Sequence, residues 1–163
     1  MEDITGHFLG RETTVHLFLP TADGAVPAEK RYERENVFEG HGETVLVVED
    51  DKEVRSLVVR MLKGLNYHVI ETATAVEAIQ ELEEVCRVDV VLSDIGLPGG
   101  MNGYELAAAV RSEYPEIKIG FISGYDASKF PKDGLNVPNN TLLRKPFSRR
   151  KLSRLIERLI TKY

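Results

Sequence analysis

The stretch TVLVVEDDKEVRSLVVRMLKGLNYHVI, residues 44–70, decides the fold because its apolar pattern changes twice. It opens with TVLVV, a continuous apolar run typical of a strand that is covered on both faces of a parallel sheet. Apolar residues then recur at helical spacing, and YHVI (67–70) begins a second strand-like run. Strand, helix and strand in this order predict a right-handed crossover between parallel strands. The helical apolar positions are Val54, Leu57, Val58, Met61 and Leu62.

The same alternation continues outward from this stretch toward the C-terminal end of the chain. Further strand-like runs are VDVVLS (88–93), IKIGFI (117–122) and TLL (141–143), with helical apolar patterns between and after them. Five strands that alternate with helices predict an α/β fold with a doubly wound five-stranded parallel sheet. The segment 125–140 departs from this pattern because it holds Pro131, Gly134 and Pro138. We therefore expect any helix there, at about residues 126–130, to be short or irregular.

The first 42 residues divide into two further segments. Val15, Leu17 and Leu19 alternate with other residues, so residues 1–20 are predicted to hold one strand that ends at Pro20. Residues 21–42 mix Pro, Gly and charge without a sustained period and are predicted to form a linker. Residues 43–163 then form the main domain. Because a lone strand exposes an apolar edge, we expect it to favour association, as in a homodimer.

The composition narrows the class of protein. Of the 163 residues, 42% are hydrophobic and 29% are charged, which is a globular balance. No apolar run approaches the roughly 18 residues of a membrane span. The N-terminal MEDITGH lacks the apolar core of a signal peptide, and Cys86 is the only cysteine. These features exclude a disulfide scaffold and favour a cytoplasmic protein without membrane contact.

Charge is unevenly distributed along the chain. The net charge is −5, yet residues 144–163 hold eight Lys/Arg and a single acid, Glu157. A basic helix of this kind can contact nucleic acid or an acidic partner. A solvated helix face explains the same pattern, and we therefore do not expect nucleic acid as a partner.

Polar side chains that can bind a ligand or react stand where the predicted strands end. In a doubly wound sheet, ligands bind at the carboxyl ends of the strands. Acids follow the first and third strands, a serine follows the fourth and a lysine follows the fifth. Asp51 is set apart because aspartate at that position is a good cap for the following helix. The remaining residues are Glu49, Asp50, Asp94, Ser123 and Lys145.

The electrostatics of this cluster favour a bound cation. Two carboxylates about 4 Å apart repel by roughly 4 kcal/mol at an effective dielectric constant near 20. Oxygen-rich carboxylate sites suit Mg²⁺, which also binds phosphate oxygens. Aspartate is a competent phosphoryl nucleophile, and such a transfer is promoted mainly by positioning and charge neutralisation. Lys145, the Ser123 hydroxyl and backbone N–H groups would hold the phosphoryl oxygens.

Four motifs in register resemble the receiver domain of bacterial response regulators. They are VLVVEDD (45–51), VVLSDIGLPGGMNGYEL (90–106), FISGY (121–125) and LLRKPF (142–147). The resemblance covers about residues 43–162 and implies the flavodoxin-like receiver fold with strand order 2-1-3-4-5. It also implies phosphotransfer from the phosphohistidine of a cognate histidine kinase or histidine phosphotransfer protein.

The resemblance assigns a role to each matching residue. It implies that Asp94 is the phosphoacceptor and that Pro146 follows a peptide bond that is often cis. The implied Mg²⁺ ligands are Glu49 (largely through metal-bound water), Asp50, Asp94 and the carbonyl of Gly96. The implied phosphoryl-binding residues are Ser123, Gly124, Lys145 and Ile95, and the implied switch residues are Ser123 and Leu142.

Two departures from the common pattern concern output and context. Leu142 stands where the family has an aromatic switch residue, so no aromatic ring can turn inward as Ser123 moves. LPGGMNG (97–103) is one residue longer than the commoner form, a variant similar to receivers attached to hybrid histidine kinases.

GRETTVHLFLP (10–20) resembles the last strand of a histidine kinase ATPase domain, with Glu12 in place of a second glycine. The chain is thus expected to be the C-terminal end of a hybrid sensor kinase or a descendant of one.

Three alternatives remain beside the phosphoacceptor hypothesis. A phosphorylation-independent docking scaffold is one, because Leu142 and the short or irregular helix at about residues 126–130 alter the face through which the family usually signals. A second is a Mg²⁺-dependent phosphatase with an aspartyl nucleophile, but Gly96 stands where such enzymes carry a second acid. The third is a nucleic-acid-binding regulator that uses the basic last helix. Under the favoured hypothesis the domain catalyses its own phosphorylation and dephosphorylation and is a signalling module.

Overall fold

The computed structural model describes residues 37–85, 87–124 and 141–161. Five short strands form one parallel sheet in the order β2-β1-β3-β4-β5, which confirms the predicted fold class and strand order. The predicted strand at 15–19 and the predicted short helix at 126–130 lie outside the described residues. The strands are β1 (Thr44–Val48), β2 (His68–Thr72), β3 (Val90–Asp94), β4 (Lys118–Ser123) and β5 (Leu142–Arg144).

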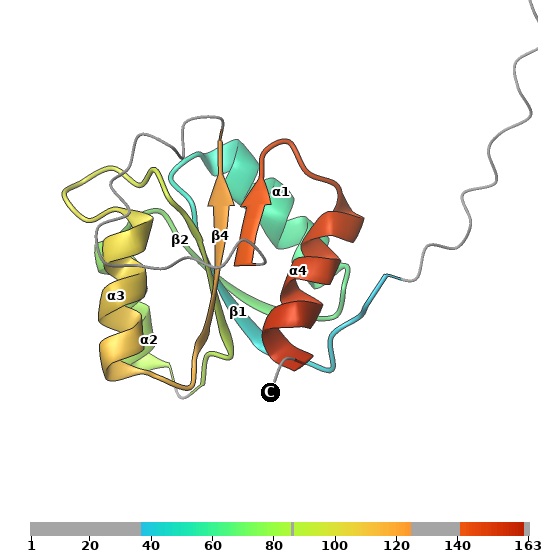
Figure 1. Cartoon of the computed structure of the whole chain (residues 1–163), viewed down its shortest axis with the longest axis horizontal. Coiled ribbons are helices and arrows are strands. Elements are labelled where there is room, and N and C mark those ends of the chain that lie inside the picture. Colours follow the sequence, from blue (N-terminus) through green and yellow to red (C-terminus); the bar gives the residue numbers. More distant parts are fainter. Residues whose placement is uncertain (1–36, 86, 125–140, 162–163) are drawn as a thin grey trace, which may run out of the picture. The chain divides into compact units, whose positions relative to one another are not determined.

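The helices cover both faces of the sheet, as a doubly wound fold requires. Helices α1 and α4 lie on one side of the sheet, and α2 and α3 lie on the other (Figure 1). Alternate residues of each central strand enter the two cores, which is why these strands carry apolar residues on both faces. The bounds are α1 (Lys52–Lys63), α2 (Ala75–Glu84), α3 (Gly103–Glu113) and α4 (Arg149–Thr161). None of the helices in the described part of the chain combines the length and apolar character needed to cross a bilayer.

Side-chain caps start the first three helices. The Asp51 carboxylate accepts hydrogen bonds from the N–H groups of Glu53 and Val54 at 2.8 and 3.1 Å, which confirms its expected capping role. Thr74 and Asn102 begin α2 and α3 with reciprocal capping boxes. These caps fix where each loop at the carboxyl edge ends, and so they position the residues that the loops carry.

Residues 37–42, hereafter the strap, pack against the domain although they fall at the end of the predicted linker. The Phe38 carbonyl accepts a hydrogen bond of 2.9 Å from the buried Ser153 hydroxyl of α4. The Gly40 N–H donates to the Leu65 carbonyl at 2.7 Å, and the Asn66 amide donates to the Gly40 carbonyl at 2.7 Å. The strap therefore connects α4 with the turn between α1 and β2.

Candidate functional site

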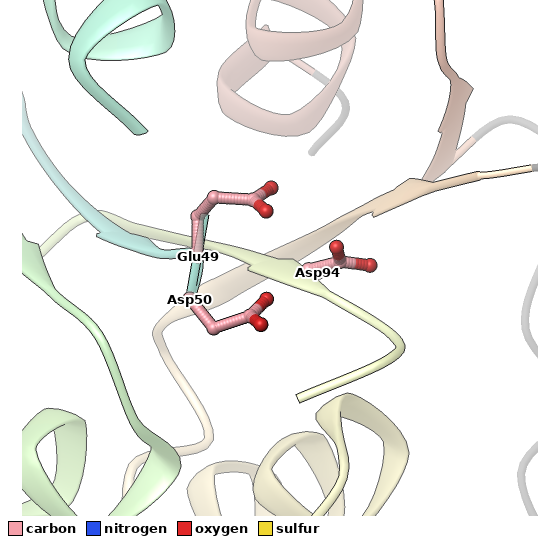
Figure 2. Close-up of side chains that lie close together, drawn as sticks. All are labelled: Glu49, Asp50 and Asp94. Atoms are coloured by element: carbon pink, nitrogen blue, oxygen red, sulfur yellow. The ribbon is translucent and has the colours of Figure 1, made fainter. Parts of the chain in front are cut away.

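Three carboxylates from two adjacent strands meet at the carboxyl edge of the sheet. Glu49 and Asp50 directly follow β1, and Asp94 is the last residue of β3. Each offers one oxygen that lies within 4.8 Å of the others, and the carboxylates of Glu49 and Asp50 extend toward the side on which Asp94 lies (Figure 2). Glu49 is buried, Asp94 is half-buried and Asp50 is exposed. The parallel register of β1 and β3 brings these sequence-predicted residues together.

Lys145 connects two of these carboxylates. Its Nζ donates to Glu49 Oε2 and to Asp94 Oδ2, each at 2.7 Å. The Lys145 backbone N–H donates to the Ser123 carbonyl at 2.7 Å, which extends the pairing of β4 and β5 by one residue. The peptide bond between Lys145 and Pro146 is cis, as the resemblance implies. The structure thus brings Lys145 into contact with Asp94, the predicted phosphoacceptor.

The electrostatics of this cluster shift two pKa values. Burial is the main cause that raises the pKa of Glu49 from 4.5 to about 7, with a contribution from the neighbouring Asp94 charge and partial opposition from the Lys145 hydrogen bond. Burial by itself lowers the pKa of Lys145, but the hydrogen bonds to Asp94 and Glu49 outweigh it and raise that pKa above 10.5. Lys145 is therefore charged at neutral pH, while Glu49 is partly protonated at that pH.

Of the other predicted residues, Gly96 is hydrogen-bonded to Asp94, while Ile95 and Ser123 have different hydrogen-bond partners. The Gly96 N–H donates to Asp94 Oδ1 at 3.1 Å. The Ile95 N–H is engaged in the sheet, because it donates to the Ile122 carbonyl at 3.1 Å. The buried Ser123 hydroxyl donates to the Gly124 carbonyl at 2.8 Å. In this structure the Ser123 hydroxyl is thus bound within its own loop, and the Gly96 N–H is bound to the Asp94 carboxylate.

Leu142 opens β5 opposite Phe121 of β4. Its partly buried side chain packs against the core on the α2 and α3 side of the sheet. The position predicted as a switch is therefore occupied by an aliphatic side chain that contributes to the core.

The sequence profile of the response regulator receiver domain matches residues 45–157. The chain belongs to this family. It is 37% identical to the sensor kinase CckA of Brucella abortus (strain 2308) over 94% of this chain, and it spans only 17% of that kinase's length. It is 33% identical to the response regulator receiver protein CpdR of the same organism, over 71% of this chain and 95% of CpdR.

The solved structures agree with this assignment. A response regulator receiver protein from Sinorhizobium medicae WSM419 superposes with a TM-score of 0.65 at 25% identity, over 74% of this chain and 95% of that one. The acidic cluster of Glu49, Asp50 and Asp94 is of the type that forms the Mg²⁺ site of receivers.

A further observation supports the fit of these carboxylate oxygens to Mg²⁺. Among the described residues, Glu49 Oε1 is buried without a hydrogen-bond partner. A buried carboxylate oxygen of this kind is costly unless a cation or a bound water reaches it. Asp50 adds an exposed carboxylate beside it, and hard oxygen ligands are those that Mg²⁺ prefers. The residues therefore suit a magnesium ion.

Two features of this receiver were not found from the sequence. Arg55 of α1 donates to the backbone carbonyl oxygens of Glu49 and Asp50. Helix α3 begins so close to β3 that a Cβ on Gly103 would lie 2.1 Å from the Asp94 carbonyl oxygen. The sequence offers only their positions: Arg55 follows Asp50 by five residues, and Gly103 follows Asn102, which caps α3.

Proposed function

We propose that this receiver accepts a phosphoryl group from a phosphohistidine onto Asp94 in two-component signalling, with Mg²⁺ bound at Glu49, Asp50, Asp94 and the Gly96 carbonyl. The observation that carries the proposal is the contact of Lys145 Nζ with Asp94 Oδ2 at 2.7 Å beside two further carboxylates. The lysine would pair with the phosphoryl oxygens, and the three acids would hold the Mg²⁺ that neutralises the remaining phosphoryl charge.

The transfer would proceed by in-line displacement at phosphorus. An Asp94 carboxylate oxygen forms the new P–O bond as the P–N bond to the histidine breaks, and the imidazole leaves with the electron pair of that bond. Mg²⁺ would supply neutralisation of the phosphoryl charge. Lys145 would exchange its hydrogen bond from the Asp94 carboxylate to a phosphoryl oxygen, and the Gly96 N–H stands 3.1 Å from the same carboxylate to do likewise.

The response to phosphorylation would involve Ser123 and Gly124. The Ser123 hydroxyl would leave the Gly124 carbonyl and turn toward the phosphoryl group, which frees that carbonyl. Ile95, which the resemblance includes among the phosphoryl-binding residues, would act through its place in the loop because its N–H is held by Ile122. Since Leu142 has no ring to turn inward, we infer that movement of the loop itself biases the two conformations.

We further propose that the parent protein is a hybrid histidine kinase and that the phosphoryl donor is its own kinase core or a histidine phosphotransfer protein. The alignment with the sensor kinase CckA covers 94% of the 163 residues and so leaves out only about ten. It therefore includes most of residues 1–36, beyond the receiver match that begins at residue 45. A shared segment before the receiver supports the kinase-derived extension that the sequence suggests.

Intact mass after incubation with acetyl phosphate tests the phosphoacceptor. We expect a phosphoryl adduct that requires Mg²⁺ and is lost in Asp94→Asn. Glu113→Gln, which removes an exposed acid at the end of α3, is the matched control and should behave like the wild type. An adduct that survives Asp94→Asn would contradict the assignment. A folded, Mg²⁺-binding wild type that is phosphorylated by neither acetyl phosphate nor a kinase would favour a docking scaffold.

A further inference from the structure

Arg55 holds the backbone of the loop that carries two of the site's carboxylates. Its Nη1 donates to the Glu49 carbonyl oxygen at 2.5 Å and to the Asp50 carbonyl oxygen at 3.2 Å. Its Nε lies 3.5 Å from Oε2 of Glu71 in β2. The side chain is only 16% exposed. One guanidinium thus connects α1, the loop after β1 and strand β2.

These contacts restrict the backbone on both sides of Asp50. A peptide unit is planar, so a hydrogen bond that holds its carbonyl oxygen limits how the whole unit can turn. The units that flank the Asp50 Cα have the carbonyls of Glu49 and Asp50, and Arg55 holds both. On either side, the Glu49 N–H donates to the Thr72 carbonyl at 3.2 Å, and the Asp51 carbonyl accepts from the Arg55 N–H at 2.8 Å. With both peptide units held in this way, the direction of the Asp50 Cα–Cβ bond is restricted.

Position and charge predict opposite effects of Arg55 on a cation. A positive charge near an acidic cluster repels Mg²⁺, so its removal would strengthen binding if charge were all that mattered. Fixed ligands bind a metal more tightly than mobile ones, so its removal would weaken binding if positioning dominates. The sign of the change therefore distinguishes the two contributions.

We propose that Arg55 is a positioning residue of the Mg²⁺ site, which acts by clamping the carbonyl oxygens of Glu49 and Asp50 so that their carboxylates remain directed at one point. The inference rests on the proposed function, because it takes Mg²⁺ as the ion of the site. It requires two nitrogens of the guanidinium, because Nη1 holds both carbonyl oxygens while Nε lies beside Glu71, and a lysine ammonium offers one nitrogen only.

Calorimetric titration of the metal-free chain with MgCl₂ tests the proposal. We expect Arg55→Ala and Arg55→Lys each to weaken Mg²⁺ binding by about 10- to 100-fold, the range usual for loss of a residue that orients metal ligands. Arg60→Ala is the matched control, because Arg60 is an exposed arginine on the same helix, and we expect its affinity to stay within about twofold of the wild type. Unchanged or tighter binding by Arg55→Ala, or wild-type affinity in Arg55→Lys, would overturn the proposal.

Amide hydrogen exchange of the metal-free protein gives a second readout that does not depend on Mg²⁺. We expect faster exchange in residues 49–52 of both Arg55 variants and unchanged exchange in β3 and β4. Slowed, unchanged or globally accelerated exchange would overturn a local clamp. If the wild type itself binds no Mg²⁺, the proposed function fails, while the exchange experiment still decides whether Arg55 positions this loop.

Discussion

Replacing Lys145 by methionine removes the cation from between Glu49 and Asp94 while keeping a side chain of similar length. The ligand oxygens of the three acids lie within 4.8 Å of one another. At that separation each carboxylate pair repels by roughly 3–4 kcal/mol at an effective dielectric constant near 20. Removal of one member of a buried ion pair typically costs 3–5 kcal/mol. Lys145 is 23% exposed, so we expect Lys145→Met to lower the unfolding free energy of the metal-free protein by about 3 kcal/mol at pH 8.

This destabilisation should depend on pH through Glu49. In the wild type the folded-state pKa of Glu49 is raised from 4.5 to about 7, so this group lowers stability as pH rises from 4.5 to 7 and has no further effect above. Without Lys145 the folded-state pKa rises further, and the loss of stability continues above pH 7. The difference between variant and wild type should thus widen by up to about 1.4 kcal/mol per pH unit above pH 7.

Urea denaturation at pH 6, 7, 8 and 9 measures this difference, with and without Mg²⁺. Because Lys145 competes with a metal ion for the same carboxylates, we expect Mg²⁺ to stabilise the variant more than the wild type at pH 8. Lys151→Met, which removes an exposed lysine from α4, should show neither effect. A difference that stays constant from pH 6 to pH 9, or that Mg²⁺ leaves unchanged at pH 8, would refute the reasoning.

Two further substitutions test close contacts of the fold. Gly103→Ala would place a Cβ 2.1 Å from the Asp94 carbonyl oxygen. We therefore expect the free energy of unfolding, measured by urea denaturation, to fall by about 1–3 kcal/mol and phosphorylation by acetyl phosphate to become slower. Wild-type values for both would show that α3 can move away from β3 without cost. Ser153→Ala removes the donor to the Phe38 carbonyl and should cost about 0.5–1.5 kcal/mol with faster amide exchange in the strap. Thr161→Ala, which removes an exposed hydroxyl from the same helix, is its control, and equal exchange in the two variants would contradict the role of Ser153.

The sheet could be predicted from the sequence because its strands are covered on both faces. A strand such as TVLVV must then be apolar at nearly every position, and the structure has β1 at Thr44–Val48 as predicted. The ends of other strands differ by one or two residues; β3, for example, runs to Asp94 because that residue still pairs with Ile122. Pairing across the sheet, which a single strand does not reveal, decides these ends.

The site was predictable to the level of its acids and its lysine. Parallel strands bring their carboxyl ends to one edge, so Glu49, Asp50 and Asp94 follow from topology. The bridge of Lys145 between Glu49 and Asp94 did not follow, because it depends on the path of the chain after β5. Arg55 was missed for a similar reason, since its partners are backbone carbonyls that no residue type reveals.

The strap shows that the receiver's sequence motifs begin later than the polypeptide that completes its fold. Val37 packs against the core shared by α1 and α4, and the Phe38 carbonyl meets a hydroxyl from a residue 115 positions later in the chain. A receiver cut at residue 43 would lose this contact and leave the Ser153 hydroxyl buried without its partner. A segment that keeps the receiver's packing intact therefore has to begin no later than residue 37.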